Sequence, residues 1–215
     1  MTEPIWPSDE LRAALAIFEK SEQAALQAWA SMLETPEMFS LDLLANGAVK
    51  RFVSVSSGLK AMIEARNMGC ARGLLRMHID TALRFSAAWH VDKPHDFAHE
   101  IHRGTHVRSL KDSQGEKMTD RRLVEMFSAE HPWLPDVYDS LSGYIHLSGS
   151  HISSAIVALG EDQTISMRIS ATDEQLPESS WLEIIHCYEE ISELFTRHLT
   201  GYALTKAQKI PPTAL

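Results

Sequence analysis

The sequence predicts one all-α domain of about seven helices, spanning residues 1–215, with a small β-hairpin before the C-terminal helix. Two observations carry this prediction. Apolar residues recur with the 3.6-residue period of an amphipathic helix along most of the chain, and only after residue 151 do short, β-branched, partly alternating runs replace it. With 215 residues, 44% of them hydrophobic, the chain is long enough to fill one core.

Three helices are predicted in the N-terminal part of the chain. Ser8 is placed to cap the first, which ends before Pro36. The second opens at Ser40 and runs to about Asn67, although the glycines at 47 and 58 weaken it. The third covers about residues 69–89 and has the cleanest pattern, because its apolar side chains share one face.

Shorter elements follow in the middle of the chain. Pro94 occupies a favoured first-turn position of a short helix rich in histidine. Residues 109–120 form a polar loop with Gly115 at its tip, and Thr119 caps the next helix. Another helix follows Pro135.

The last part of the chain predicts a hairpin and a long helix. The runs "ISSAIVAL" and "TISMRIS" are joined by "GEDQ" and predict a β-hairpin over about residues 152–170. Such a two-stranded ribbon is stable only against another surface or strand. Residues 178–205 or so then form the C-terminal helix, apolar at one position per turn.

Composition limits the classes of function. A net charge of −9 argues against broad, non-specific binding to the phosphate backbone of nucleic acids. The sequence has no apolar run long enough for a membrane span, and its first residues lack the pattern of a secretory signal. The two cysteines are far apart, which favours a reducing compartment, so we expect a cytoplasmic protein.

Four histidines stand close together in "KPHDFAHEIHRGTHV", namely His95, His99, His102 and His106. Their spacing of i, i+4, i+7 and i+11 places them on one stripe of a helix, and histidines one turn apart can bind one divalent metal ion. Gly104 interrupts the stripe before its last member. The alternative is a solvated or pH-responsive helix face, since histidines titrate near neutrality. No cofactor is otherwise expected.

A second group of polar residues surrounds the segments "LKDSQGEKMTD" and "VYDSLSGYIHLSGSHI". This combination resembles a group of uncharacterised bacterial helical proteins over about residues 60–155, a resemblance that implies no assigned activity. It implies a shared constellation that comprises Arg72, Arg76, Lys111, Asp112, Asp120, Tyr144, His146, Ser148 and His151.

Each member of this constellation also has a structural interpretation. Arg76 and Asp80 are one helical turn apart and form a helix-stabilising pair. Alternatively, Arg72 and Arg76 point into a cleft beside His146 and bind phosphate or carboxylate. Ser148 is placed to cap a helix end.

Helical ribonucleases of the HEPN type offer an enzymatic alternative, because they use an arginine followed four to six residues later by histidine. Arg72 with His78 and Arg84 with His90 have this spacing. In a chain with eleven histidines such matches arise by chance, and the acidic balance argues against an RNA grip. Motifs of other common enzymes are missing from the sequence.

We therefore expect a binding or interaction module for a protein partner or a small anionic ligand. The enzymatic alternatives are a metal-dependent hydrolase that uses the histidine stripe and the helical ribonuclease. The broad apolar helix faces and the open hairpin edge predict a homodimer, formed by strand pairing or by helix packing.

Overall fold

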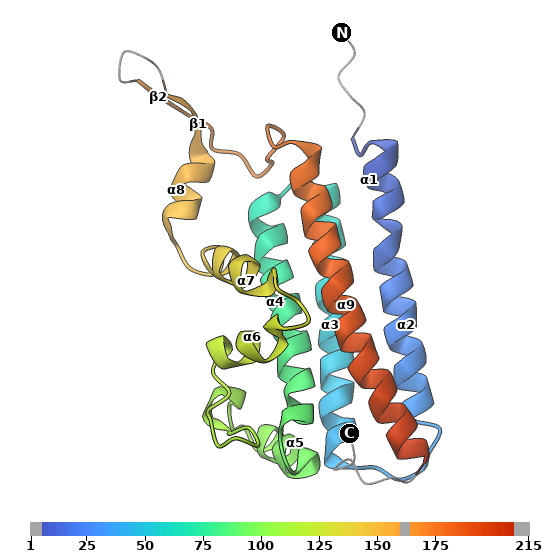
Figure 1. The fold of residues 1–215 in the computed structure, drawn as a ribbon. Coiled ribbons are helices and arrows are strands. Elements are labelled where there is room, and N and C mark those ends of the chain that lie inside the picture. Colours follow the sequence, from blue (N-terminus) through green and yellow to red (C-terminus); the bar gives the residue numbers. More distant parts are fainter. Residues whose placement is uncertain (1–5, 160–163, 209–215) are drawn as a thin grey trace.

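The computed structural model describes residues 6–159 and 164–208 and is mostly helical, with one small antiparallel hairpin before the C-terminal helix, as predicted (Figure 1). The α-helices are α1 (Asp9–Ala14), α2 (Ala16–Met32), α3 (Ser40–Glu64), α4 (Met68–Ser86), α5 (Pro94–His102), α6 (Asp120–Ser128), α7 (Leu134–Ser142), α8 (Gly149–Ala155) and α9 (Glu178–Ala207). Two 3-10 helices, η1 (Ala87–His90) and η2 (Val107–Ser109), and the strands β1 (Ile156–Leu159) and β2 (Ile165–Met167) complete the described elements.

The four long helices α2, α3, α4 and α9 form a bundle (Figure 1). α9 packs on α2 and α4, and α3 packs on α2 and α4. Aromatic side chains meet at the centre, where the rings of Phe52 and Phe195 stack with centroids 4.8 Å apart and Phe85 lies against Phe195. The apolar stripes of the sequence therefore face one another, as amphipathic helices require.

Local signals set several helix ends where the sequence predicts them. The Oγ of Ser8 accepts a hydrogen bond from the backbone of Leu11 at 3.1 Å, and the Oγ1 of Thr119 accepts one from Arg122 at 3.3 Å. These caps satisfy amides that have no partner inside their own helices. Pro94 begins α5, as expected.

None of the helices in residues 6–159 and 164–208 combines the length and apolar character that crossing a bilayer requires. Even α9, with 30 residues, carries charged side chains along its length.

The hairpin is shorter than the predicted range of 152–170. Residues 152–155 belong to α8, so the prediction of a strand there is wrong, and in the described part of the hairpin the strands cover 156–159 and 165–167. The reason is local: the Oγ of Ser148 accepts from the Ser150 amide at 3.2 Å and donates to the Gly143 carbonyl at 2.7 Å, which starts a helix. The predicted "GEDQ" turn, residues 160–163, lies outside the described residues.

Candidate anion-binding pocket

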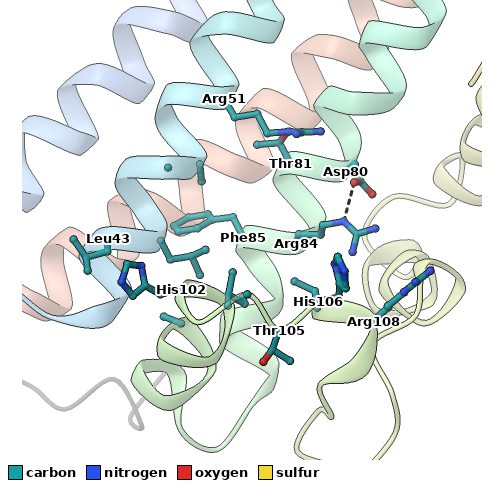
Figure 2. Close-up of a pocket in the computed structure, with 17 residues that line it drawn as sticks. Leu43, Arg51, Asp80, Thr81, Arg84, Phe85, His102, Thr105, His106 and Arg108 are labelled. Carbon is teal, nitrogen blue, oxygen red and sulfur yellow. Dashed lines mark hydrogen bonds and ion pairs between the residues drawn. The ribbon is translucent and has the colours of Figure 1, made fainter.

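A cavity of about 760 Å³ lies between α3, α4, α5 and the turn that follows α5 (Figure 2). We call it the basic pocket. Its lining consists of Leu43, Leu44, Gly47, Ala48, Arg51, Asp80, Thr81, Arg84, Phe85, Ala98, Ile101, His102 and residues 104–108. It therefore draws on segments that are far apart in the sequence.

Part of the lining is apolar. Leu44 and Ala48 come from α3, Phe85 from α4 and Ile101 from α5, and all four also pack on the bundle core. Such a wall favours the apolar part of a ligand, because covering it removes apolar surface from water.

The polar part of the lining carries more positive than negative charge. The positive charges are those of Arg51, Arg84 and Arg108, with His102 and His106 as further basic side chains, while Asp80 is the one carboxylate among the described lining residues. In Figure 2, Arg84, His106 and Arg108 lie on one side of the pocket and His102 on the other, beside Leu43. Because the whole chain has a net charge of −9, this local excess of positive charge distinguishes the pocket from the average surface and suits an anion.

Arg51 is the arginine best placed to bind a ligand. Its Nε donates to the Oγ1 of Thr81 at 2.8 Å, and that hydroxyl donates to the carbonyl of Met77 at 2.8 Å. Within the described part of the chain, Arg51 has no ion-pair partner, so the outer nitrogens of its guanidinium keep their donors for a ligand.

Arg84, by contrast, belongs to an ion-pair network with Arg76, Asp80 and Asp120. Its Nε lies 2.7 Å from Asp80 and its Nη2 lies 2.6 Å from Asp120, while Arg76 contacts the same carboxylates at 3.3 and 3.7 Å. Burial by itself would lower the pKa of Arg84, but the hydrogen bonds and charges of Asp80 and Asp120 raise it above its ordinary value. The network fixes the Arg84 side chain at the edge of the pocket.

The same network borders a second cavity, of about 630 Å³, lined in part by Arg76, Asp120, Tyr138, Ser142 and His146. The guanidinium of Arg76 lies 3.5 Å from the centroid of the Tyr138 ring, and its Nε donates to the Oγ of Ser142 at 3.4 Å. Of the predicted constellation, Arg76, Asp120 and His146 thus meet here, and the predicted Arg76–Asp80 pair is confirmed. Asp80 and Asp120 already neutralise the charges of Arg76 and Arg84, so this cavity is less suited to an anion.

Arg72 and the Tyr/Ser/His segment meet at a third cavity, of about 580 Å³. Arg72 donates to the hydroxyl of Tyr144, its guanidinium lies 4.8 Å from the centroid of that ring, and the His151 ring lies 5.6 Å from it. Ser148 caps α8, which confirms its structural interpretation.

Lys111 and Asp112 lie apart from these cavities, in the loop after η2. Asp112 is buried and accepts two hydrogen bonds from Arg122, at 2.7 and 2.9 Å, and one each from the amides of Gln114 and Glu116, at 2.9 Å. Burial would raise the pKa of Asp112, but these donors lower it. Asp112 therefore organises its own loop, and the predicted constellation is divided among several places.

The histidine stripe is shorter than predicted. α5 ends at His102, and Gly104 has φ = +97°, so His106 lies outside the helix and the prediction of four histidines on one helical stripe is wrong. His95 packs on Phe39 with ring centroids 5.1 Å apart, and burial lowers the pKa of His95. Among the described residues, no group of three or more His, Cys, Asp or Glu side chains is arranged to hold a metal ion.

The two ribonuclease-like pairs do not face a common cleft. His78 is fully buried between Phe52 and Tyr188, and burial lowers the pKa of His78 to about 3. Arg84 lines the basic pocket, whereas His90 lines a different cavity. Neither pair is arranged to act together on one substrate.

Comparison with known proteins gives no guide to the function, because no family model, no curated protein and no solved structure matches the chain. The resemblance to a group of bacterial helical proteins therefore stays a prediction.

The basic pocket contains Arg51, which no sequence pattern singled out, and Arg84, which the sequence placed only in a ribonuclease-like pair with His90. A signal existed on α4, where Arg76, Asp80 and Arg84 follow at steps of four residues. Gly47 was a second signal in the sequence, because a glycine inside a long helix often has a packing or functional reason. In the structure, a Cβ built at Gly47 meets nothing within 4 Å.

Proposed function

We propose that the chain binds a small organic anion, such as a carboxylate or phosphate with an apolar body, in the basic pocket. The observation that carries the proposal is Arg51, a guanidinium without an ion-pair partner among the described residues, held by Thr81 at the edge of a partly apolar cavity. A planar guanidinium binds carboxylate and phosphate oxygens with two parallel hydrogen bonds.

Two parts of the lining bind different parts of the ligand: basic side chains bind the anionic group, and apolar side chains contact the apolar body. Arg51 supplies fixed donors for the anionic group, because Thr81 holds its Nε and its outer nitrogens have no ion-pair partner among the described residues, whereas Arg84 stays paired with Asp80 and Asp120 at the edge of the pocket. Donors that are already positioned lose little conformational entropy when a ligand binds. The wall of Leu44, Phe85 and neighbouring side chains then accepts the apolar body.

The proposal is one of binding, without a bond-making step. No described metal-ligand cluster supports the hydrolase alternative, and the burial of His78 removes one of the two histidines of the ribonuclease alternative. A cytosolic setting remains part of the proposal, since the chain has only two cysteines, Cys70 and Cys187, both free.

Calorimetric titration with hexanoate, hexyl phosphate and hexylammonium tests the proposal, because the three probes share one apolar chain and differ in charge. We expect the two anions to bind and the cation not to bind. Added salt should weaken binding, because exposed charges are screened. Equal binding of hexanoate and hexylammonium, or no binding of either anion, would contradict the proposal.

Two variants locate the binding. Arg51→Gln should weaken hexanoate binding about tenfold or more, the effect of losing a charge-assisted hydrogen bond. Arg103→Gln is the matched control, because Arg103 is exposed at the end of α5 and does not line the pocket. Gly47→Met should also weaken binding by filling the cavity from α3 without changing its charge.

A further inference from the structure

Part of the chain extends away from the bundle (Figure 1). Large apolar side chains are exposed on this part. We call the described residues 145–159 and 164–169, which include α8, β1 and β2, the arm. Its exposed apolar residues are Ile145, Leu147, Ile152, Leu159, Ile165, Met167 and Ile169, with exposed fractions between 46% and 91%. So many exposed large apolar side chains in one short part of the chain point to an interaction surface.

The two strands of the arm do not make a stable unit by themselves. β1 has four residues and β2 has three, and they pair only with each other in the described structure. An isolated two-stranded hairpin is marginally stable in water, and three or more strands with an apolar face are needed. The arm therefore needs more strands than one chain supplies.

The sequence around β2 is complementary to itself. Residues alternate from Ile165 through Ser166, Met167 and Arg168 to Ile169, so continuing β2 by two extended residues beyond Met167 sets the three apolar side chains on one face. A two-fold axis at Met167 sets each Ile165 opposite Ile169 of a second copy, and each Met167 opposite its own counterpart. Arg168 then faces Ser166, so no like charges are opposed.

Among residues 6–159 and 164–208, no strand other than β1 pairs with β2, which leaves its second edge open for this pairing. The amide of Arg168 donates to the carbonyl of Ala155 at 2.9 Å, on the side of β1. Because successive amides of a strand point to opposite sides, the amides of Met167 and Ile169 point to the open edge.

The arm carries little charge, so two copies of an acidic chain can meet there. Two chains with a net charge of −9 repel each other unless they meet at a weakly charged surface. Arg168 is the one Lys, Arg, Asp or Glu side chain in the described residues of the arm. The acidic chain is also repelled by the anionic lipids of a membrane surface.

We propose that two copies of the chain form a homodimer by pairing their β2 strands in antiparallel orientation about a two-fold axis at Met167. The result is a continuous four-stranded sheet whose apolar face carries Ile165, Met167 and Ile169 from both copies.

Sedimentation velocity over a wide concentration range tests the association. We expect a dimer for the natural sequence and an increase of at least tenfold in its dissociation constant for Met167→Lys, which places two positive charges opposite each other. Leu204→Lys is the matched control, since Leu204 is an exposed apolar residue of α9 outside the arm. A chain that is monomeric throughout, or a dimer that Met167→Lys leaves unchanged, overturns the proposal.

Cross-linking tests the register, in a background with Cys70→Ser and Cys187→Ser. Directly opposed residues of an antiparallel pair have Cα atoms about 5.5 Å apart, within the range of a disulfide. Met167→Cys should cross-link to itself under mild oxidation, whereas Ile165→Cys should cross-link efficiently only when mixed with Ile169→Cys. Cross-linking of Met167→Cys no greater than that of Leu204→Cys overturns the proposed register.

Discussion

The bundle and the arm differ in which groups they bury: the bundle buries charged groups, and the arm exposes apolar ones. Inside the bundle, Asp42 and Lys206 are buried charges whose polar atoms have partners. In the arm, side chains such as Leu147 and Ile169 are apolar and lie in water. At Asp42 and Lys206 the bundle supplies the partners of its buried charges from its own chain, whereas the arm gains from a contact with another molecule.

The largest expected effect concerns the buried pair at the end of the bundle. The Nζ of Lys206 donates to Asp42 and to the carbonyl of Met32, both at 3.0 Å, and the hydroxyl of Tyr202 donates to Asp42 at 2.9 Å. Asp42→Ala leaves a buried ammonium without its counter-charge and should lower the free energy of unfolding by about 3–5 kcal/mol. Urea denaturation measures this loss.

An exposed pair and a double variant sharpen this prediction. Glu130→Ala breaks the surface pair with Arg197 and should cost about 1 kcal/mol or less. Asp42→Leu combined with Lys206→Met should recover most of the stability, since apolar replacement of both partners removes the unpaired charge. A loss for Asp42→Ala no larger than that for Glu130→Ala would contradict the account of the bundle.

The same substitution at one leucine of each region compares how much each side chain contributes to the free energy of unfolding. Leu59 on α3 is fully buried, and Leu159 on β1 is largely exposed. Leu59→Ala should lower the free energy of unfolding by about 2–5 kcal/mol through the cavity it leaves. Leu159→Ala should change that of the monomer by about 0.5 kcal/mol or less. Denaturation at protein concentrations below dimer formation measures both, and equal losses would show that the arm packs on the bundle.

A smaller effect depends on pH. Burial lowers the pKa of His78 in the folded chain to about 3, below its ordinary value of 6.5, so the unfolded chain binds more protons between these values. Above pH 6.5 the imidazole is neutral in both states and the free energy of unfolding has its full value. As the pH decreases from 6.5 toward 3, the unfolded chain takes up a proton that the folded chain does not, so the free energy of unfolding decreases. Between pH 6.5 and 5 the loss should be about 2 kcal/mol.

His78→Gln isolates this contribution, because the amide of glutamine retains a donor for Ser192, whose Oγ lies 2.9 Å from the Nε2 of His78. The stability of the natural sequence relative to His78→Gln should fall on acidification. A difference between the two that stays constant from pH 7 to pH 5 would mean that the pKa of His78 is the same in the folded and unfolded chains, which would contradict the prediction.

The elements that the sequence predicts best are those with local causes. The caps at Ser8 and Thr119 and the start of α5 at Pro94 depend on neighbouring residues alone, and each is found as predicted. α3 runs without a break from Ser40 to Glu64 despite its two glycines, because packing on α2 and α4 outweighs their low helix propensity.

What the sequence did not predict depends on contacts between distant segments. The basic pocket joins Arg51 of α3 to Arg84 of α4 and His106 after α5, and no local pattern relates them. The start of the predicted hairpin failed for a different reason: a run as short as "ISSA" has too few residues to separate the two periods, and the cap at Ser148 decides for helix.

The position of α9 in the chain has a consequence for biosynthesis. α9 packs on α1, α2 and α4, yet it is translated about 90 residues after α4 is finished. At the roughly 5–20 residues per second of ribosomal synthesis, the earlier helices wait on the order of ten seconds for the helix that covers them. During that time the apolar helix faces that the finished bundle buries are exposed on the nascent chain and accessible to chaperones. Productive folding therefore depends on how fast translation reaches α9.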